Sequence, residues 1–147
     1  MRRARDETTS TYQHAACGEE STMAHENGGE HGAGEEQDEI HACIEECISC
    51  HAVCMNTVPY CLETGGAHAD AAHVRLLLDC AQACQLSADF MLRGSDYHEE
   101  ACALCAEVCR ACEASCREFA DDEDMLACAE VCATCATACE QMADMEQ

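Results

Sequence analysis

Apolar residues and cysteines recur three and four positions apart in four stretches of the chain, which is the spacing of one face of an α-helix. Residues 1 to about 36 show no such period and are rich in Gly, Glu, His, Ser and Thr. The pattern therefore predicts an all-α protein, with a disordered acidic and His-containing tail over residues 1–37 and one helical domain over residues 38–147. The predicted helices cover residues 38–63, 70–93, 95–119 and 121–145.

Glycines and acidic residues mark the ends of these predicted helices. Gly65 and Gly66 follow the first helix, where glycine commonly ends a helix. Asp96, with Glu99 three positions later, resembles a capping box at the start of the third helix, and Pro59 should kink the last turn of the first. The connections are short, so sequential helices should lie antiparallel in an up-down-up-down four-helix bundle with a cysteine-lined core.

Cysteine defines the predicted inner face of this bundle. On three of the helices it repeats with alternating steps of three and four, the spacing of the positions that face a bundle axis. The second helix carries only two cysteines, and Leu77, Ser87 and Met91 complete its stripe. Sixteen of the seventeen cysteines should therefore line one interior; they are Cys43, Cys47, Cys50, Cys54, Cys61, Cys80, Cys84, Cys102, Cys105, Cys109, Cys112, Cys116, Cys128, Cys132, Cys135 and Cys139.

Three explanations of this stripe compete with a store of metal ions. Buried cysteine packs as a small hydrophobic residue, but a core that needed only small apolar side chains would mostly use Ala and Val. Disulfides along one straight helix would need Cβ atoms closer than the helical spacing of about 5–6 Å. Iron–sulfur clusters usually take their cysteines from loops, whereas these lie within continuous helix. An iron–sulfur electron-transfer protein is the alternative function.

The charge of a buried core indicates which metal the thiols would hold. Replacing one thiol proton by one monovalent cation leaves the core charge unchanged. Zinc needs about four thiolates per ion, so sixteen thiolates would keep a net charge of about −8 out of water, and buried uncompensated charge is very costly. The pattern therefore favours Cu(I), a soft monovalent ion selected by thiolates and thioethers.

Histidine and methionine gather at the two predicted ends of the cysteine stripe. In this topology His41, Met91, His98 and Met142 meet at one end, just outside the first cysteines. These four are soft or borderline ligands for Cu(I). We expect them to bind metal and to form the route by which copper enters the core. The opposite end offers Cys61, with His73, Phe119, Met125 and the nearby Tyr60.

Composition and charge set further limits on the function. Thirty acidic residues face seven basic ones, all of them Arg, for a formal net charge of −23, which disfavours binding to nucleic acid or to an anionic membrane. An acidic chain without Lys is typical of a salt-accumulating halophile, which we expect as its origin. The first residues lead into no apolar segment, so the sequence predicts no signal peptide, no membrane span, a cytoplasmic location and reduced thiols.

The cysteine repeats resemble those of a known family. Cys43-x3-Cys47-x2-Cys50-x3-Cys54 and the matching repeats at 102–116 and 128–139 look like the four-helix-bundle copper storage proteins, and the stretch 80–95 is similar to the second helix of that family. The resemblance covers residues 38–145. It implies a non-enzymatic cytosolic store whose core thiolates hold many Cu(I) ions, an open end lined by His or Met, and assembly into a homo-tetramer.

Overall fold

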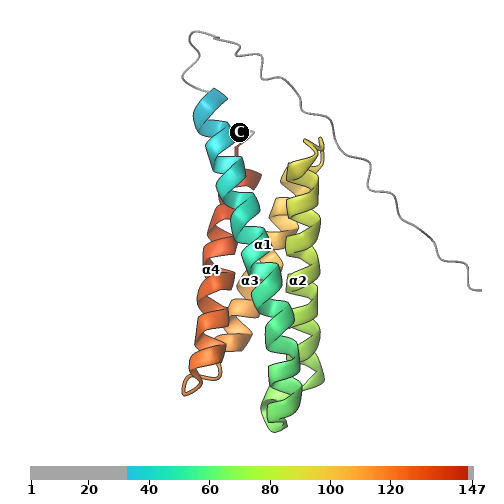
Figure 1. The fold of residues 1–147 in the computed structure, drawn as a ribbon, viewed down its shortest axis with the longest axis vertical. Coiled ribbons are helices and arrows are strands. Elements are labelled where there is room, and N and C mark those ends of the chain that lie inside the picture. Colours follow the sequence, from blue (N-terminus) through green and yellow to red (C-terminus); the bar gives the residue numbers. More distant parts are fainter. Residues whose placement is uncertain (1–32, 146–147) are drawn as a thin grey trace, which may run out of the picture.

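Four α-helices make up most of the computed structural model, which describes residues 33–145 (Figure 1). They are α1 (Ala33–Thr64), α2 (Ala71–Leu92), α3 (His98–Arg117) and α4 (Glu123–Ala143), and a short 3₁₀ turn, η1 (Gly66–Ala69), joins α1 to α2. No strand occurs in this part of the chain. The predicted all-α class is confirmed.

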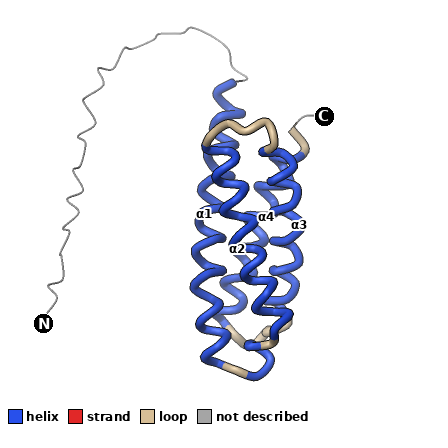
Figure 2. Tube along the Cα trace, turned by 90° about the vertical axis from the view of Figure 1, so that its right-hand side faces the viewer, coloured by secondary structure: helices blue, strands red, loops and turns tan. Residues whose placement is uncertain are grey.

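The helices form an antiparallel bundle in which each one packs against two neighbours. Helix α1 contacts α2 and α4, and α3 contacts the same two helices. The α1–α2 and α3–α4 connections lie at one end of the bundle, and the α2–α3 connection lies at the other (Figures 1 and 2). We name these the η1 end and the α2–α3 end. The predicted up-down-up-down topology is confirmed.

Helix α1 begins earlier than the sequence pattern predicted. It starts at Ala33 instead of residue 38, and its first turn carries Glu35 and Glu36, which the helix dipole favours at an N-terminus. This exposed segment extends past the other helices (Figure 1). It therefore has no apolar face, and no hydrophobic periodicity in the sequence could have predicted it. The helix also continues through Pro59 to Thr64. The rest of the predicted tail, residues 1–32, lies outside the described residues.

Side-chain caps fix the starts of two helices. The Asp70 carboxylate accepts a hydrogen bond from the amide of Ala72 at the start of α2. Asp122 accepts from the amides of Asp124 and Met125 at the start of α4, at 3.0 and 3.2 Å. Each cap satisfies amides that have no partner within the helix.

The capping box predicted at Asp96 and Glu99 is wrong. Helix α3 begins at His98, so Tyr97 holds the cap position without a side-chain cap bond, and Glu99 falls one place short of the third helical residue that a capping box uses. The Ser95 hydroxyl instead accepts from the amide of Tyr97 at 3.1 Å. Gly94, with φ of 61°, supplies the left-handed turn that ends α2.

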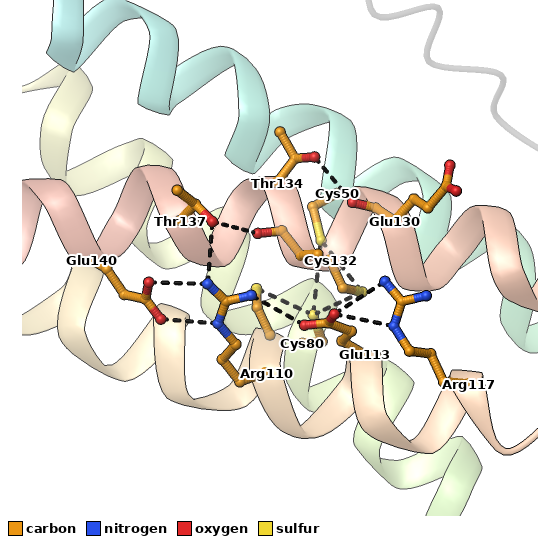
Figure 3. Close-up of polar contacts among 12 residues, drawn as sticks. Cys50, Cys80, Arg110, Glu113, Arg117, Glu130, Cys132, Thr134, Thr137 and Glu140 are labelled. Carbon is orange, nitrogen blue, oxygen red and sulfur yellow. Dashed lines mark hydrogen bonds and ion pairs between the residues drawn. The ribbon is translucent and has the colours of Figure 1, made fainter.

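The outer surface is strongly acidic, and arginine holds part of it together. Arg110 on α3 donates to both carboxylate oxygens of Glu140 on α4, at 2.9 and 3.0 Å, and also to Thr137 and Glu113 (Figure 3). Arg117 donates to Glu113 as well. The bonds from Arg110 to Glu140 and Thr137 join α3 to α4, whereas those to Glu113 lie within α3. None of the described helices combines the length and the apolar run that a membrane crossing requires.

We expect the metal-free, reduced protein to be folded, because neutral thiols pack like small apolar groups. Its far-UV circular dichroism spectrum should show the helix content of the bundle. If the chain comes from a halophile, helicity should rise toward molar salt, because screening weakens the repulsion within a net charge of −23. Full helicity in dilute buffer would contradict the halophile origin, and a coil at every salt concentration would contradict the preformed core.

Candidate metal centre

A continuous column of sulfur atoms runs along the axis of the bundle, as the stripe predicted. All sixteen core cysteines are free thiols and are at most 1% exposed. Helix α2 contributes only Cys80 and Cys84, both in the middle of the column. Its other inward positions include Leu77 and Ser87, which are fully buried, and the Ser87 hydroxyl donates to the carbonyl of Ala101 at 2.9 Å. Alanines such as Ala88 and Ala129 fill the space between the stripes.

Neighbouring sulfur atoms are at the distances that a shared metal ion requires. Several Sγ–Sγ separations between helices are 3.5–4.0 Å, for example 3.5 Å from Cys47 to Cys139 and from Cys80 to Cys109. Three sulfurs around an ion with metal–sulfur bonds of about 2.3 Å would lie about 4 Å apart. A disulfide needs about 2.05 Å. The column is therefore arranged as reduced ligands rather than as cross-links.

Twelve of the sixteen core sulfurs gather in overlapping groups that draw on different helices, and Cys61, Cys112, Cys116 and Cys128 lie outside these groups. Within each group every pair of ligand atoms lies within 4.8 Å, and Cys50, Cys135 and Cys139 each belong to two groups. Figure 3 shows Cys50, Cys80 and Cys132 meeting from three helices. Because the groups share members, an ion in one group lies next to an ion in the next. The groups are Cys43, Cys102, Cys139; Cys47, Cys105, Cys135, Cys139; Cys50, Cys84, Cys109, Cys135; and Cys50, Cys54, Cys80, Cys132.

Burial and mutual hydrogen bonding set the protonation of the thiols. At the η1 end, desolvation raises the pKa of Cys61 from 9.0 to about 11. Deeper in the core, hydrogen bonding with Cys109 holds the pKa of Cys50 far below its ordinary range, whereas hydrogen bonding with Cys112 raises that of Cys54 far above it. Hydrogen bonds from neighbouring thiols favour the charged form of some cysteines and burial disfavours it for all of them, so full ionisation of the core requires cations.

At the α2–α3 end, methionine and histidine extend the column. Met91 and Met142 are buried, and the Cys102 thiol donates to the Met91 Sδ at 3.8 Å. The half-buried His98 donates from Nδ1 to the carbonyl of Ser95 at 2.8 Å, which leaves its Nε2 lone pair for a metal. Met91 and His98 also line a cavity of about 240 Å³. Three of the four side chains predicted at this end therefore gather there.

His41, the fourth, does not belong to the stripe. It is exposed, and Ile40 is the residue that packs against the core. Counting back from Cys47 by four and then by three leads to residues 43 and 40, so the alternating register excludes position 41. The predicted inward position of His41 is wrong for this reason.

At the η1 end, three buried soft ligands converge on one point. The Cys61 thiol lies 3.6 Å from Nε2 of His73 and donates to the Met125 Sδ at 3.7 Å. All three side chains are at most 6% exposed. Nδ1 of His73 lies 2.7 Å from the Ser115 hydroxyl, and burial lowers the pKa of this imidazole. Its Nε2 therefore faces the two sulfur atoms with a lone pair that a metal ion can accept. The sequence assigned only Cys61 of this set to metal, although His73 and Met125 also lie on the stripe register.

Comparison with known proteins gives a consistent result. Residues 36–144 match the copper storage protein family. The chain is similar to Cu(I)-bound BsCsp3 of Bacillus subtilis, with 39% identity and a TM-score of 0.67 over 71% of this chain and 98% of that one. A cytosolic copper storage protein of Streptomyces lividans with five coppers gives 31% identity and a TM-score of 0.69 over 75% and 96%. YhjQ, an uncharacterised cysteine-rich protein of B. subtilis, is 40% identical over 55% of this chain and 75% of its own length.

The buried thiols should make the metal-free fold sensitive to alkali. The folded-state pKa of Cys61 is raised from 9.0 to about 11, so its contribution to stability is fully present below pH 9 and is lost as the pH rises through 11. We expect the urea midpoint, measured by circular dichroism in reducing buffer, to fall steadily from pH 8.5 to pH 10.5. The Cys61→Ala variant should show a shallower fall. A midpoint that does not change over this range would contradict neutral packing of the thiols.

Proposed function

The chain belongs to the copper storage protein family, and from that premise we propose that it is a cytosolic, non-catalytic store whose sixteen core thiolates hold Cu(I). The observation that carries the proposal is the set of sixteen buried free thiols in one core, twelve of which gather in groups whose sulfurs lie within 4.8 Å of one another. The cytosolic location is supported by the likeness to the cytosolic S. lividans protein. An iron–sulfur function is not favoured, because every cluster ligand would have to come from within continuous helices packed around a narrow axis.

Charge balance explains how one small core can accept many ions. Each Cu(I) that binds releases about one thiol proton, so the net charge of the core stays near zero as the column fills. The four-sulfur groups would also suit zinc in shape. Filling them with divalent ions would nevertheless leave a large negative charge in a core that excludes water. The free-energy cost of this buried charge limits zinc to a few sites.

We expect anaerobic titration with Cu(I), in competition with a chelator of known affinity, to saturate near sixteen ions per chain. About one proton per ion should be released into a weakly buffered solution, and the loaded protein should be colourless. Removing Cys17, which lies outside the described residues, should leave the capacity almost unchanged. Saturation at four or fewer ions, or a brown protein that contains iron, would contradict the proposal.

The ends of the column are proposed to transfer copper rather than to store most of it. Imidazole and thioether groups bind Cu(I) more weakly than two thiolates do, so they can pass an ion inward without trapping it. At the α2–α3 end, Met91, His98 and Met142 lie outside Cys102, and we propose that Cu(I) enters the column at this end. The exposed His41 would be the first side chain to bind the incoming ion. At the η1 end, Cys61, His73 and Met125 would hold a terminal ion.

Replacing Met91, His98 and Met142 together, by Leu, Ala and Leu, should slow uptake in stopped-flow loading. The capacity should stay within about two ions of wild type, because all sixteen thiols are retained. The matched control is His73→Ala with Met125→Leu at the η1 end. Slow loading of this control alone, or wild-type rates in both variants, would contradict the proposed route.

Assembly into a homo-oligomer, a tetramer by resemblance, is part of the same proposal. Ile48, Met55 and Leu62 are exposed and lie seven residues apart on α1, so they form one apolar line along its outer face. Leu104 on α3 is also exposed, whereas Ile44, four residues before Ile48 on α1, is buried inside the monomer. The mass of the full chain by light scattering tests this proposal, and a monomer would contradict it.

A further inference from the structure

The η1 turn covers the end of the bundle where Cys61, His73 and Met125 meet. None of its residues is buried. It begins at Gly66, directly after Gly65, and these two glycines have φ of 59° and 76°, in the left-handed region that glycine adopts readily. The amide of Gly65 bonds to the carbonyl of Cys61 at 3.1 Å, and Asp70, just after η1, caps the helix that carries His73. The turn therefore connects two ligand-bearing helix ends through a flexible glycine pair.

One side chain attaches this turn to the opposite half of the bundle. Nε2 of His68 lies 2.8 Å from Oδ2 of Asp122, in the α3–α4 connection. The Tyr60 hydroxyl donates to the same oxygen at 2.7 Å, and the His68 ring packs on Phe119 with 4.2 Å between centroids. We refer to His68, Asp122, Tyr60 and Phe119 as the clasp. No residue of the turn is buried, and His68 is the residue of the turn whose side chain bonds to the α3–α4 connection.

The clasp lies directly above the soft ligands. Phe119 packs against His73 with 4.9 Å between ring centroids, and His73 in turn contacts Cys61. A cleft of about 290 Å³ beside the clasp is lined by Ala67 of the turn together with His73, Ser115 and Phe119. Displacing the turn would widen this cleft and free Phe119, the ring that covers His73. The same small movement would thus expose the terminal ligands to a molecule outside.

We propose that η1 is a lid over the η1 end of the sulfur column, held shut by the His68–Asp122 contact, and that its opening controls exchange of copper there. This inference rests on the proposed copper store and adds its regulation. With the lid shut, an ion on Cys61, His73 and Met125 is covered by aromatic rings. With the lid open, an external thiol or chelator reaches these ligands through the cleft. Opening changes the rate of exchange and leaves the number of sites the same.

The test compares His68→Ala with His51→Ala in the full-length, copper-loaded protein. His51 is a matched control, because it also makes one hydrogen bond between elements, from Nδ1 to the carbonyl of Ala81 at 2.7 Å, but in the middle of the bundle. Excess bathocuproine disulfonate removes the copper, and the rate is followed by absorbance. We expect His68→Ala to raise the rate of copper removal about fivefold. Loss of one net hydrogen bond increases the fraction of molecules with an open lid by about that factor, and the removal rate follows this fraction. His51→Ala should match wild type.

A second measurement reports on the lid without copper. Amide hydrogen exchange of residues 66–69 in the metal-free protein should quicken in His68→Ala and not in His51→Ala. The His68→Phe variant keeps a ring on Phe119 and should give an intermediate removal rate. Equal removal rates in wild type and His68→Ala, or equal acceleration by both Ala variants, would overturn the lid. Failure of wild type to bind copper would instead overturn the proposed store, so the two failures are distinguishable.

Discussion

The interior of the bundle must remain close to electrically neutral, because its ionisable sulfurs have no access to water. Sixteen thiols that are at most 1% exposed can stay protonated, or can exchange protons for an equal number of monovalent cations, without leaving buried charge behind. Either state allows the four helices to pack in the same way. This constraint explains why the core can be preformed, why the ion it favours is monovalent, and why ionisation without metal should weaken the fold.

The exterior carries the charge that the interior excludes. Acidic residues outnumber basic ones by thirty to seven, and Arg110 and Arg117 neutralise part of this excess where α3 and α4 meet. These contacts are exposed, so they contribute modestly to stability. Their position leaves the sulfur column free of guanidinium groups. A strongly anionic surface also raises the local concentration of cations around the ends of the bundle.

The register of the cysteine stripe carried most of what the sequence could predict. Alternating steps of three and four on three helices, together with Cys80 and Cys84 on the second, were enough for the fold class and the sixteen core thiols, and the short connections were enough for the topology. Applying the same steps without exception would also have placed Ile40 rather than His41 inside, and would have included His73, four residues before Leu77, and Met125, three before Cys128. His41 was predicted to face inward because histidine is a metal ligand, although its position does not fit the register of the stripe.

Other features depend on tertiary contacts that no local pattern encodes. The early start of α1 adds exposed residues without an apolar face, so periodicity could not reveal it. The start of α3 depends on which side chain completes the turn, and Ser95 does this instead of Asp96. The contact between His68 and Asp122 joins residues 54 positions apart. Only the antiparallel topology brings these two connections together.

The distribution of thiols along the column suggests a direction for copper movement. The Met91 end reaches the column through Cys102, and the opposite end reaches it through Cys61, whereas the middle groups offer up to four thiols each. An ion held by imidazole and thioether groups alone would keep its full positive charge, whereas an ion that replaces a thiol proton adds no charge to the core. Binding should therefore strengthen from the ends toward the middle. On the proposed route, copper would move inward by exchange between adjacent groups that share sulfurs, and the ligands at the ends would set the rate at which it enters and leaves.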